Sequence, residues 1–284
     1  MTVAHWRKWA TEQLREAGVD EPERESTYLA ALALGVDRSW ILAHPEAPVP
    51  MDVARELLVR RCRHEPMAYI KGEREFYGRM FRVGPGALIP RPETEALIER
   101  ALAVGLPEEA EVLDLGTGSG CIAVTLALER PAWRVTAVDI SAKALRWATE
   151  NVARYAVEVS LQQSDLAQGL VGRLFDLVVS NPPYVALTDP LPTEVRDWEP
   201  ASALFAGEFG LSLYARMARE LALGIKPGGS LLLEHGATQR AAISDLFHAQ
   251  GWQTRASWVD LAGLPRGLHF SPPVDIPISR ANRP

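Results

Sequence analysis

The sequence has little cysteine, and the two cysteines that it has form no recognisable pattern. Cys62 and Cys121 lack the close spacing of a zinc site or a redox motif, so no metal centre and no disulfide framework is predicted. No apolar run is long enough to span a bilayer. Residues 1–20 mix charged and apolar side chains and contain no apolar signal-peptide core. These absences predict a reduced, cytoplasmic protein without a membrane partner.

Positive charge is also scarce. The chain has 30 lysines and arginines against 36 acidic residues, which gives a formal net charge of −6. This charge balance argues against a protein whose main function is to bind nucleic acid, because neutralising the phosphates requires a basic face. Arg55, Arg60, Arg61 and Arg63 form one local basic cluster, which we interpret as a solvated helix face. No stable binding of nucleic acid is therefore expected.

The 284 residues, of which 47% are hydrophobic, suit one large domain with a smaller companion. Apolar residues recur at helical spacing from Val3 to Ala17, and Pro22 and Gly35 bracket a second helix. We predict a helical domain over residues 1–74 and a hairpin or connector, rich in glycine and proline, over 75–92. The third range, 93–284, is predicted to be the catalytic domain.

Within that third range, short apolar strands alternate with helical patterns. This alternation predicts an α/β fold, with a mainly parallel sheet covered by helices on both faces. Ligands of such sheets bind beyond the carboxyl ends of the strands. The predicted strands are Glu111–Leu115, Arg134–Val138, Glu158–Gln162, Phe175–Ser180, Ser230–Glu234 and Trp252–Trp258, with Gly267–Phe270 as a possible last one.

A glycine-rich turn, Gly116-Thr117-Gly118-Ser119-Gly120, joins the first of these strands to a helix. Its glycine spacing differs from the dinucleotide signature, and no Gly-Lys-Ser/Thr follows to make a phosphate-binding P-loop. Asp139 ends the next strand about twenty residues later, where a carboxylate can accept both hydroxyls of a ribose. Its alternative role is an N-cap for the helix near Ser141. Asp165 and Leu166 follow the third strand and are candidate adenine contacts. A nucleoside ligand such as S-adenosylmethionine is favoured.

The segment Asn181-Pro182-Pro183-Tyr184 follows a buried strand at the same edge of the sheet. Asn181 and the carbonyl of Pro182 are two fixed acceptors for the two hydrogens of a substrate NH2 group. Tyr184 offers a flat face for stacking. An amide nitrogen is a poor nucleophile, and holding both N–H groups orients it toward an activated methyl group. The motif therefore predicts methylation of a planar amide or amine nitrogen.

With these motifs in place, the chain resembles the peptide chain release factor glutamine methyltransferases. The resemblance is strongest from Glu65 to Gly263, and this chain differs from the usual family pattern at Leu166, often aromatic, and Leu264, usually polar. The segments that carry it, besides the glycine-rich turn and Asn181–Tyr184, are Glu65–Gly72, Glu75–Gly78, Ile89–Glu95, Glu199–Leu211, Glu234–Gly236, Gln239 and Asp260–Gly263.

This resemblance implies a class I methyltransferase domain with a Rossmann-like, seven-stranded sheet, and an N-terminal helical domain that recognises a protein substrate. The implied reaction is methylation of the glutamine in the Gly-Gly-Gln motif of class 1 release factors, with S-adenosylmethionine as cofactor. The alternatives are an enzyme acting on an amino group of rRNA or DNA, and a binding protein without turnover. The implied cofactor contacts are Gly116, Thr117, Gly118, Ser119, Gly120, Asp139, Asp165, Leu166 and Asn181. The substrate contacts are Asn181, Pro182, Pro183 and Tyr184, of which Asn181, Pro182 and Tyr184 are the candidate catalytic residues.

Overall fold

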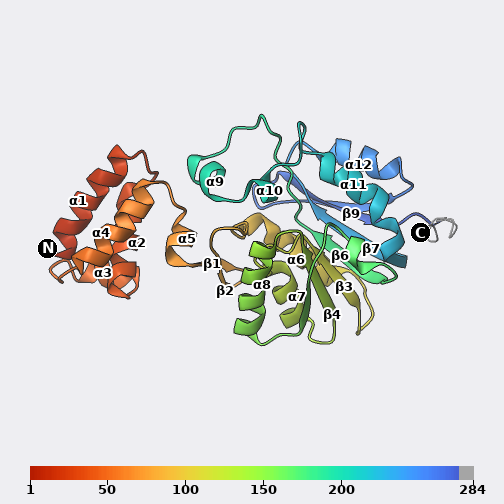
Figure 1. Ribbon diagram of the computed structural model, residues 1–284, viewed down its shortest axis with the longest axis horizontal. Coiled ribbons are helices and arrows are strands. Elements are labelled where there is room, and N and C mark those ends of the chain that lie inside the picture. The colour runs from red at the N-terminus through yellow and green to blue at the C-terminus, as the bar shows by residue number, and fades with distance from the viewer. Residues whose placement is uncertain (275–284) are drawn as a thin grey trace. The chain divides into compact units, whose positions relative to one another are not determined.

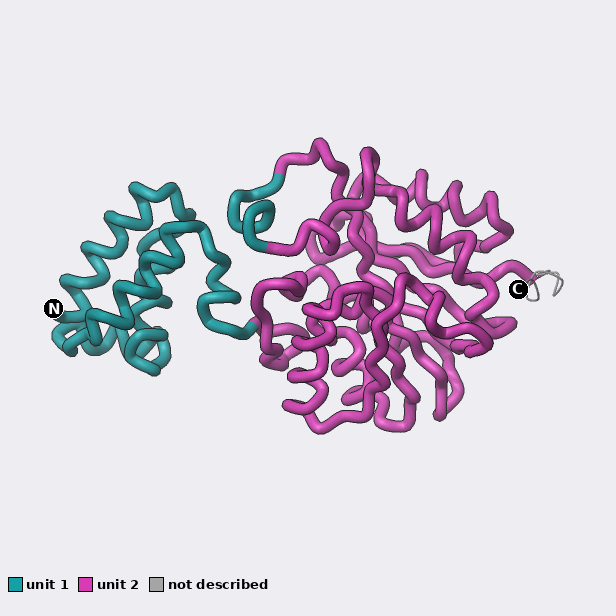
Figure 2. Tube along the Cα trace, in the orientation of Figure 1, with its two compact units in different colours: residues 1–73, 191–198 teal, residues 74–190, 199–284 magenta. Residues whose placement is uncertain are grey.

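The computed structural model describes residues 1–274, which fall into two compact units (Figure 2). The first unit consists of residues 1–73 together with 191–198. The second consists of residues 74–190 and the described residues from 199 onward. No helix in the described part of the chain has the length and apolar character needed to cross a membrane.

The first unit is helical, and its first two helices form where the sequence predicts them. Pro22 occupies the first turn of the second helix, and Gly35 follows its end with a φ of 67°, which suits glycine. A buried cluster that includes Trp6, Leu29 and Ile41 forms the core. The helices are α1 (Val3–Glu16), α2 (Pro22–Leu34), α3 (Arg38–Ala43), α4 (Met51–Cys62), α5 (Met67–Lys71) and α9 (Thr193–Trp198).

Arg61, on α4, differs from the predicted solvated face. Its side chain is buried, and its Nε donates to Glu25 Oε2 at 2.7 Å. Its Nη1 lies 3.0 Å from Glu194 Oε2 and donates to the backbone carbonyl of Glu65. The prediction is therefore wrong for Arg61, which holds α2, α4 and the segment 191–198 together within this unit. Arg55 is exposed, as predicted.

The second unit contains a seven-stranded sheet of order β5-β4-β3-β6-β7-β9-β8. The neighbours from β5 to β7 are parallel, and β9 is antiparallel to both β7 and β8. The predicted mainly parallel class I methyltransferase fold is confirmed. The strands are β3 (Glu111–Leu115), β4 (Arg134–Asp139), β5 (Val159–Gln163), β6 (Phe175–Ser180), β7 (Ile225–Glu234), β8 (Gln253–Val259) and β9 (Pro265–Ser271), and β1 (Glu73–Phe76) pairs with β2 (Arg79–Arg82) in a separate two-stranded sheet.

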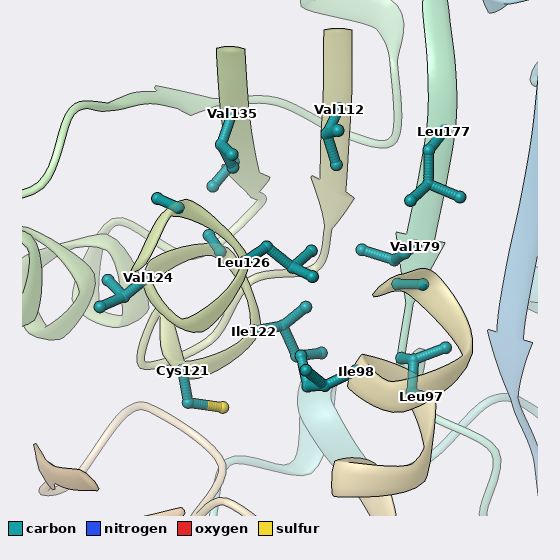
Figure 3. Packing of buried hydrophobic residues seen from close by; sticks show 14 of the residues in the cluster. Leu97, Ile98, Val112, Cys121, Ile122, Val124, Leu126, Val135, Leu177 and Val179 are labelled. Atoms are coloured by element: carbon teal, nitrogen blue, oxygen red, sulfur yellow. The ribbon is translucent and has the colours of Figure 1, made fainter. Parts of the chain in front are cut away.

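Helices cover both faces of the large sheet, as Figure 1 shows for α6, α7 and α8 on one side and α11 and α12 on the other. Alternate strand residues point to opposite faces, so Val112 and Leu113 belong to different core clusters. Figure 3 shows the first of these clusters, in which α6 and α7 pack on the strands. The helices are α6 (Glu95–Ala103), α7 (Cys121–Glu129), α8 (Ala142–Tyr155), α10 (Ala201–Leu204), α11 (Ser212–Glu220) and α12 (Arg240–His248), with short 3-10 turns η1 (Pro92–Thr94), η2 (Gln168–Leu170) and η3 (Ala222–Gly224).

Candidate active site

A cavity of about 390 Å³ lies beyond the carboxyl ends of β3, β4 and β6. The parallel sheet brings the turns that follow these strands to one edge, so motifs far apart in sequence meet there. Eight of the residues predicted for the site line the cavity: Gly116, Gly118, Asp139, Asp165, Leu166, Asn181, Pro182 and Pro183. Thr117, Ser119, Gly120 and Tyr184 lie next to these residues in the chain and are not part of the lining.

The glycine-rich turn is fixed by hydrogen bonds to the end of β4. The backbone N–H groups of Gly116 and Thr117 both donate to the carbonyl of Val138 at 2.9 Å. Gly120 is the N-cap of α7 with a φ of 81°, and a Cβ atom there would lie 3.1 Å from Ala148. Glycine is therefore required at this position both by backbone conformation and by the close approach of α8.

Asp139 supports the same turn with one carboxylate oxygen and the start of α8 with the other. Oδ2 accepts from the N–H of Gly118 at 2.9 Å, and Oδ1 accepts from the N–H of Ser141 at 2.8 Å. Ser141 itself is the N-cap of α8, through a bond from Ala144 N–H, so Asp139 does not have the alternative capping role. Each carboxylate oxygen keeps a second lone pair. Burial raises the pKa of Asp139, which shows how far it is withdrawn from water.

Asp114 lies fully buried beneath the turn and was not among the predicted site residues. Its Oδ2 accepts from the hydroxyl of Thr117 at 2.6 Å and from the N–H of Ala123 at 3.1 Å, while Oδ1 has no partner among the described residues. Burial raises its pKa to about 7. Thr117 and Asp114 therefore support the turn from below. An acidic residue inside an apolar strand is the sequence signal that points to such a role.

Asp165 is held by Arg216, a cation that no sequence motif predicts at this site. Nη1 and Nη2 of Arg216 lie 3.1 Å from Oδ1 and Oδ2 of Asp165, and Nε of Arg216 lies 3.1 Å from Oε1 of Glu220. Arg216 belongs to α11 and lines the cavity. A carboxylate has about four acceptor positions, so Asp165 can still accept another hydrogen bond.

Leu166 forms an apolar part of the cavity wall and is itself 7% exposed. Its φ of 50° lies in the left-handed region, which costs a leucine about 1–2 kcal/mol. Non-glycine residues in this conformation tend to cluster at ligand sites, where the surrounding structure compensates for the strain. The strain at Leu166 therefore fits a ligand-binding wall beside Asp165.

The residues from Ser180 to Pro183 form another part of the cavity wall, and Tyr184 follows them. The hydroxyl of Ser180 donates to the carbonyl of Leu115 at 2.6 Å, which ties the end of β6 to β3. Nδ2 of Asn181 donates to Oγ1 of Thr94 at 3.0 Å. Because its nitrogen is engaged by Thr94, Asn181 keeps its oxygen as an acceptor for another group.

Tyr184 is fixed through its backbone. Nε2 of Gln239 donates to the carbonyl of Tyr184 at 2.8 Å, and Oε1 of Gln239 accepts from the N–H of Gly236 at 3.0 Å. Burial raises the pKa of the Tyr184 phenol to about 12, so the hydroxyl stays protonated near neutral pH. Gln239 on its own gives no sequence signal for this positioning role.

Glu199 anchors the chain that leads to Thr94. Its Oε2 accepts from the N–H of Ile89 at 2.9 Å, and its Oε1 forms an ion pair with Arg91. Glu199 is 5% exposed, and Pro200, the next residue, lines the cavity. The segments Ile89–Glu95 and Glu199–Leu211 are therefore connected by this contact.

The cavity suits S-adenosylmethionine chemically. Glycines let the backbone approach a ligand closely, and the Asp139 carboxylate lines the cavity as a hydrogen-bond acceptor. Leu166 and Ile140 supply apolar wall for a flat base. The carboxylate of Asp139 also favours a positively charged ligand such as a sulfonium.

Comparison with known proteins gives a consistent result along the chain. The PrmC N-terminal domain model matches residues 5–72, and the Methyltransferase small domain model matches residues 94–191. The release factor glutamine methyltransferase of Koribacter versatilis is 43% identical over 274 residues, which cover 94% of this chain and 97% of that protein. The protein of the same name from Cereibacter sphaeroides is 43% identical over 273 residues, with the same coverage.

Among solved structures, a methyltransferase from Pyrococcus furiosus superposes with a TM-score of 0.53 at 19% sequence identity. The match covers 69% of this chain and 89% of that chain. At this identity the likeness shows the fold alone.

Proposed function

The chain belongs to the family of release factor glutamine methyltransferases, and on that premise we propose that it methylates the side-chain amide nitrogen of the glutamine in the Gly-Gly-Gln motif of class 1 peptide chain release factors. The observation that carries this proposal is that Asn181, Pro182 and Pro183 line the same cavity as the glycine-rich turn and Asp139. An acceptor for an NH2 group thus faces a site suited to a methyl donor.

S-adenosylmethionine supplies an activated methyl group, so the protein needs to bind and orient the reactants. Gly116 and Gly118 line the cavity where the backbone can approach the cofactor, and Thr117, Ser119 and Gly120 complete the turn. Asp139 is placed to hold the ribose, and Asp165 with Leu166 to hold the adenine. These residue roles are proposals supported by the shape and chemistry of the cavity.

The residues that bind the substrate glutamine must make its amide nitrogen reactive. Oδ1 of Asn181 and the carbonyl of Pro182 accept the two hydrogens of the glutamine NH2, which aims the nitrogen at the methyl group. Accepting these hydrogens also favours the positive charge that develops on the nitrogen during transfer. Tyr184 and Pro183 complete the binding surface for the flat amide.

We further propose that three consecutive ranges of the chain have different functions. Residues 1–74 recognise the release factor, residues 75–92 act as a connector, and residues 93–284 carry out methyl transfer. The match of residues 5–72 to the PrmC N-terminal domain model supports a dedicated first part. A cytoplasmic location and the lack of stable nucleic-acid binding are consistent with a net charge of −6.

The direct test is transfer of a labelled methyl group from S-adenosylmethionine to three substrates. These are a purified class 1 release factor, the same factor with its Gly-Gly-Gln glutamine changed to alanine, and ribosomal RNA. We expect label on the unchanged factor alone. Label on the RNA would instead assign the site to a base amino group, and equal label on both factors would place the acceptor elsewhere in the protein.

The role of Asn181 is tested by Asn181→Ala. The substitution removes an acceptor that matters most during transfer, so we expect the single-turnover rate to fall by about 100-fold or more. Binding of S-adenosylhomocysteine, measured by calorimetry, should stay nearly unchanged. Gln250→Ala, at an exposed amide, is the control. A parallel loss of cofactor affinity and rate in Asn181→Ala would contradict the acceptor role.

A further inference from the structure

Glu234 is a buried carboxyl group beside the acceptor segment, and no cation among the described residues forms a salt bridge with it. It is the last residue of β7, and the parallel register pairs Leu233 with Ser180. Glu234 therefore lies one residue beyond the Leu233–Ser180 pair, level with Asn181, which follows β6. The residue is 1% exposed, and neither carboxylate oxygen has a hydrogen-bond partner among the described residues. Such a group is costly to bury, so its position calls for an explanation.

Thr94 lies between Glu234 and Asn181. It is 3% exposed, and its hydroxyl oxygen accepts from Nδ2 of Asn181 at 3.0 Å. The same hydroxyl lies close enough to Glu234 to lower the pKa of that carboxyl, although the pair does not reach full hydrogen-bond geometry. Because Asn181 fills one lone pair of the Thr94 oxygen, the hydroxyl hydrogen is free to turn toward Glu234.

The charges around Glu234 do not form a salt bridge with it. Arg91 is paired with Glu199, and Arg266 is paired with Asp260 through Nη2 at 2.9 Å. Burial raises the pKa of Glu234 to about 7, and the more distant arginines oppose the shift only in part. The titratable groups that face it or adjoin it are Arg91, Glu93, Tyr184, Tyr214, His235 and Arg266.

We propose that Glu234 is a positioning residue for methyl transfer, which acts through Thr94 to orient the side-chain amide of Asn181. The proposal rests on the function proposed above. An ionised carboxylate can only accept hydrogen bonds, so Glu234 sets which group donates at each hydrogen bond between Glu234, Thr94 and Asn181. Thr94 then donates to Glu234 and accepts from Nδ2 of Asn181, which leaves Oδ1 of Asn181 for the substrate NH2 group.

Protonation of Glu234 removes this fixed order of donors and acceptors in the hydrogen bonds from Asn181 to Thr94 to Glu234. A neutral carboxyl group carries its own O–H donor, which competes with Asn181 for the lone pairs of the Thr94 hydroxyl. Asn181 then has no fixed partner for its nitrogen, and its amide can turn. Misplacement of a reacting group by such a change can cost about 100-fold in rate. The orientation of Asn181, and with it the rate, should therefore depend on the ionisation of Glu234.

The test is the pH dependence of single-turnover methylation of a release factor, with saturating S-adenosylmethionine. The wild-type rate should rise through pH 7 and level off above it, because Glu234 is ionised there. Glu234→Gln should lower the plateau by about 10-fold to 100-fold and flatten the profile. Thr94→Val, which breaks the link to Asn181, should do the same. The double variant should be no slower than the slower single variant, since both changes interrupt one path.

Several controls separate positioning from a loss of folding. Thr94→Ser keeps the hydroxyl and should recover most of the rate that Thr94→Val loses. Thr125→Val replaces another fully buried threonine, far along the chain on α7, and should behave as wild type. Affinity for S-adenosylhomocysteine should be the same in all variants. In infrared spectra, the wild type should show a protonated carboxyl band, lost above pH 7, that Glu234→Gln lacks, whereas the band of Asp114, whose pKa is also about 7, should remain in both proteins.

The outcomes are distinct. If Glu234→Gln keeps the wild-type rate and pH profile, the positioning role is wrong. It is also wrong if the fold-reductions in rate of Glu234→Gln and Thr94→Val multiply in the double variant. If Glu234→Gln does not fold, an unchanged pH profile in Thr94→Val is enough to overturn it. If the wild type itself leaves the release factor unlabelled, the proposed function fails, whatever the variants do.

Discussion

Glu234 illustrates at the scale of one residue how a functional group can lower stability. Its pKa is raised from 4.5 to about 7 in the folded protein, mainly by burial. A carboxyl whose pKa is raised by folding is held best in its neutral form. It therefore destabilises the folded state progressively as the pH rises from 4.5 through 7, and by a constant amount above that.

This cost predicts that Glu234→Gln is more stable than the wild type at pH 8. One pKa unit corresponds to about 1.4 kcal/mol, so the gain in free energy of unfolding should be at most about 3.5 kcal/mol. Thermal or denaturant unfolding at pH 8 and at lower pH measures it. The gain should shrink as the pH approaches 4.5, where the wild-type carboxyl becomes neutral in both states. A variant less stable than wild type at pH 8 would contradict this account.

At the same scale, residues within a sequence motif can be predicted as site residues, whereas residues that support them from other segments cannot. Asn181 and Asp139 were predicted as site residues because each follows an apolar strand within a recognisable pattern, and both line the cavity. Thr94 and Arg216 were not, because each reaches the site through a tertiary contact with a distant segment. A linear pattern shows the end of a strand and does not show which other segment packs against it.

At the scale of elements, the strands were predicted well except where local composition misled. The strand predicted at Ser230 begins at Ile225 in the structure. Pro227, Gly228 and Gly229 are typical of a turn, yet Ile225 pairs with Phe175 across an irregularity in the register. The tertiary pairing with β6 therefore overrides the local turn signal.

The turn over residues 207–211 is the element that supports the far end of the acceptor segment. Gly210 has a φ of 68°, and a Cβ atom there would lie 2.2 Å from the carbonyl oxygen of Tyr184. That carbonyl also accepts from Gln239. The turn, the acceptor segment and the start of α12 thus meet around one backbone oxygen, and there is no room for a side chain.

Gly210→Ala tests this packing. The substitution combines an unfavourable φ with a steric clash, so we expect a loss of more than about 1 kcal/mol in the free energy of unfolding. The displaced Tyr184 should also lower the single-turnover rate while binding of S-adenosylhomocysteine persists. Gly105→Ala is the matched control, because a Cβ atom at Gly105 meets nothing within 4 Å and its φ is not in the left-handed region. Equal behaviour of the two variants would show that the close approach does not matter.

At the scale of the whole molecule, the helical unit is discontinuous in sequence. Residues 191–198 belong to it together with residues 1–73. Glu194 lies 3.0 Å from Arg61, and Nε1 of Trp198 donates to the carbonyl of Arg63 at 3.1 Å. A reading of the sequence divides the chain into consecutive ranges, because charge and hydrophobic periodicity do not show that two distant segments share one core.

Arg61→Met tests how much this unit depends on its buried cation. Removal of Arg61 leaves Glu25, whose side chain is 8% exposed, as an unpaired charge. Breaking a buried pair in this way costs about 3–5 kcal/mol. Hydrogen exchange should therefore become faster in α2 and α4. Affinity for S-adenosylhomocysteine should not change, and Arg55→Met, at an exposed position, should leave exchange as in the wild type. Unchanged protection in Arg61→Met would show that the buried pair is dispensable.

The same discontinuity has a consequence for biosynthesis. A protein is made from its N-terminus, and an early domain ordinarily folds while later residues are still being added. In this chain the partners Glu194 and Trp198 are synthesised long after Arg61 and Arg63. The helical unit therefore lacks part of its structure until residue 198 of 284 has left the ribosome, by which time most of the parallel strands already exist. During translation, completion of the first unit waits for synthesis of residues 74–190 of the second.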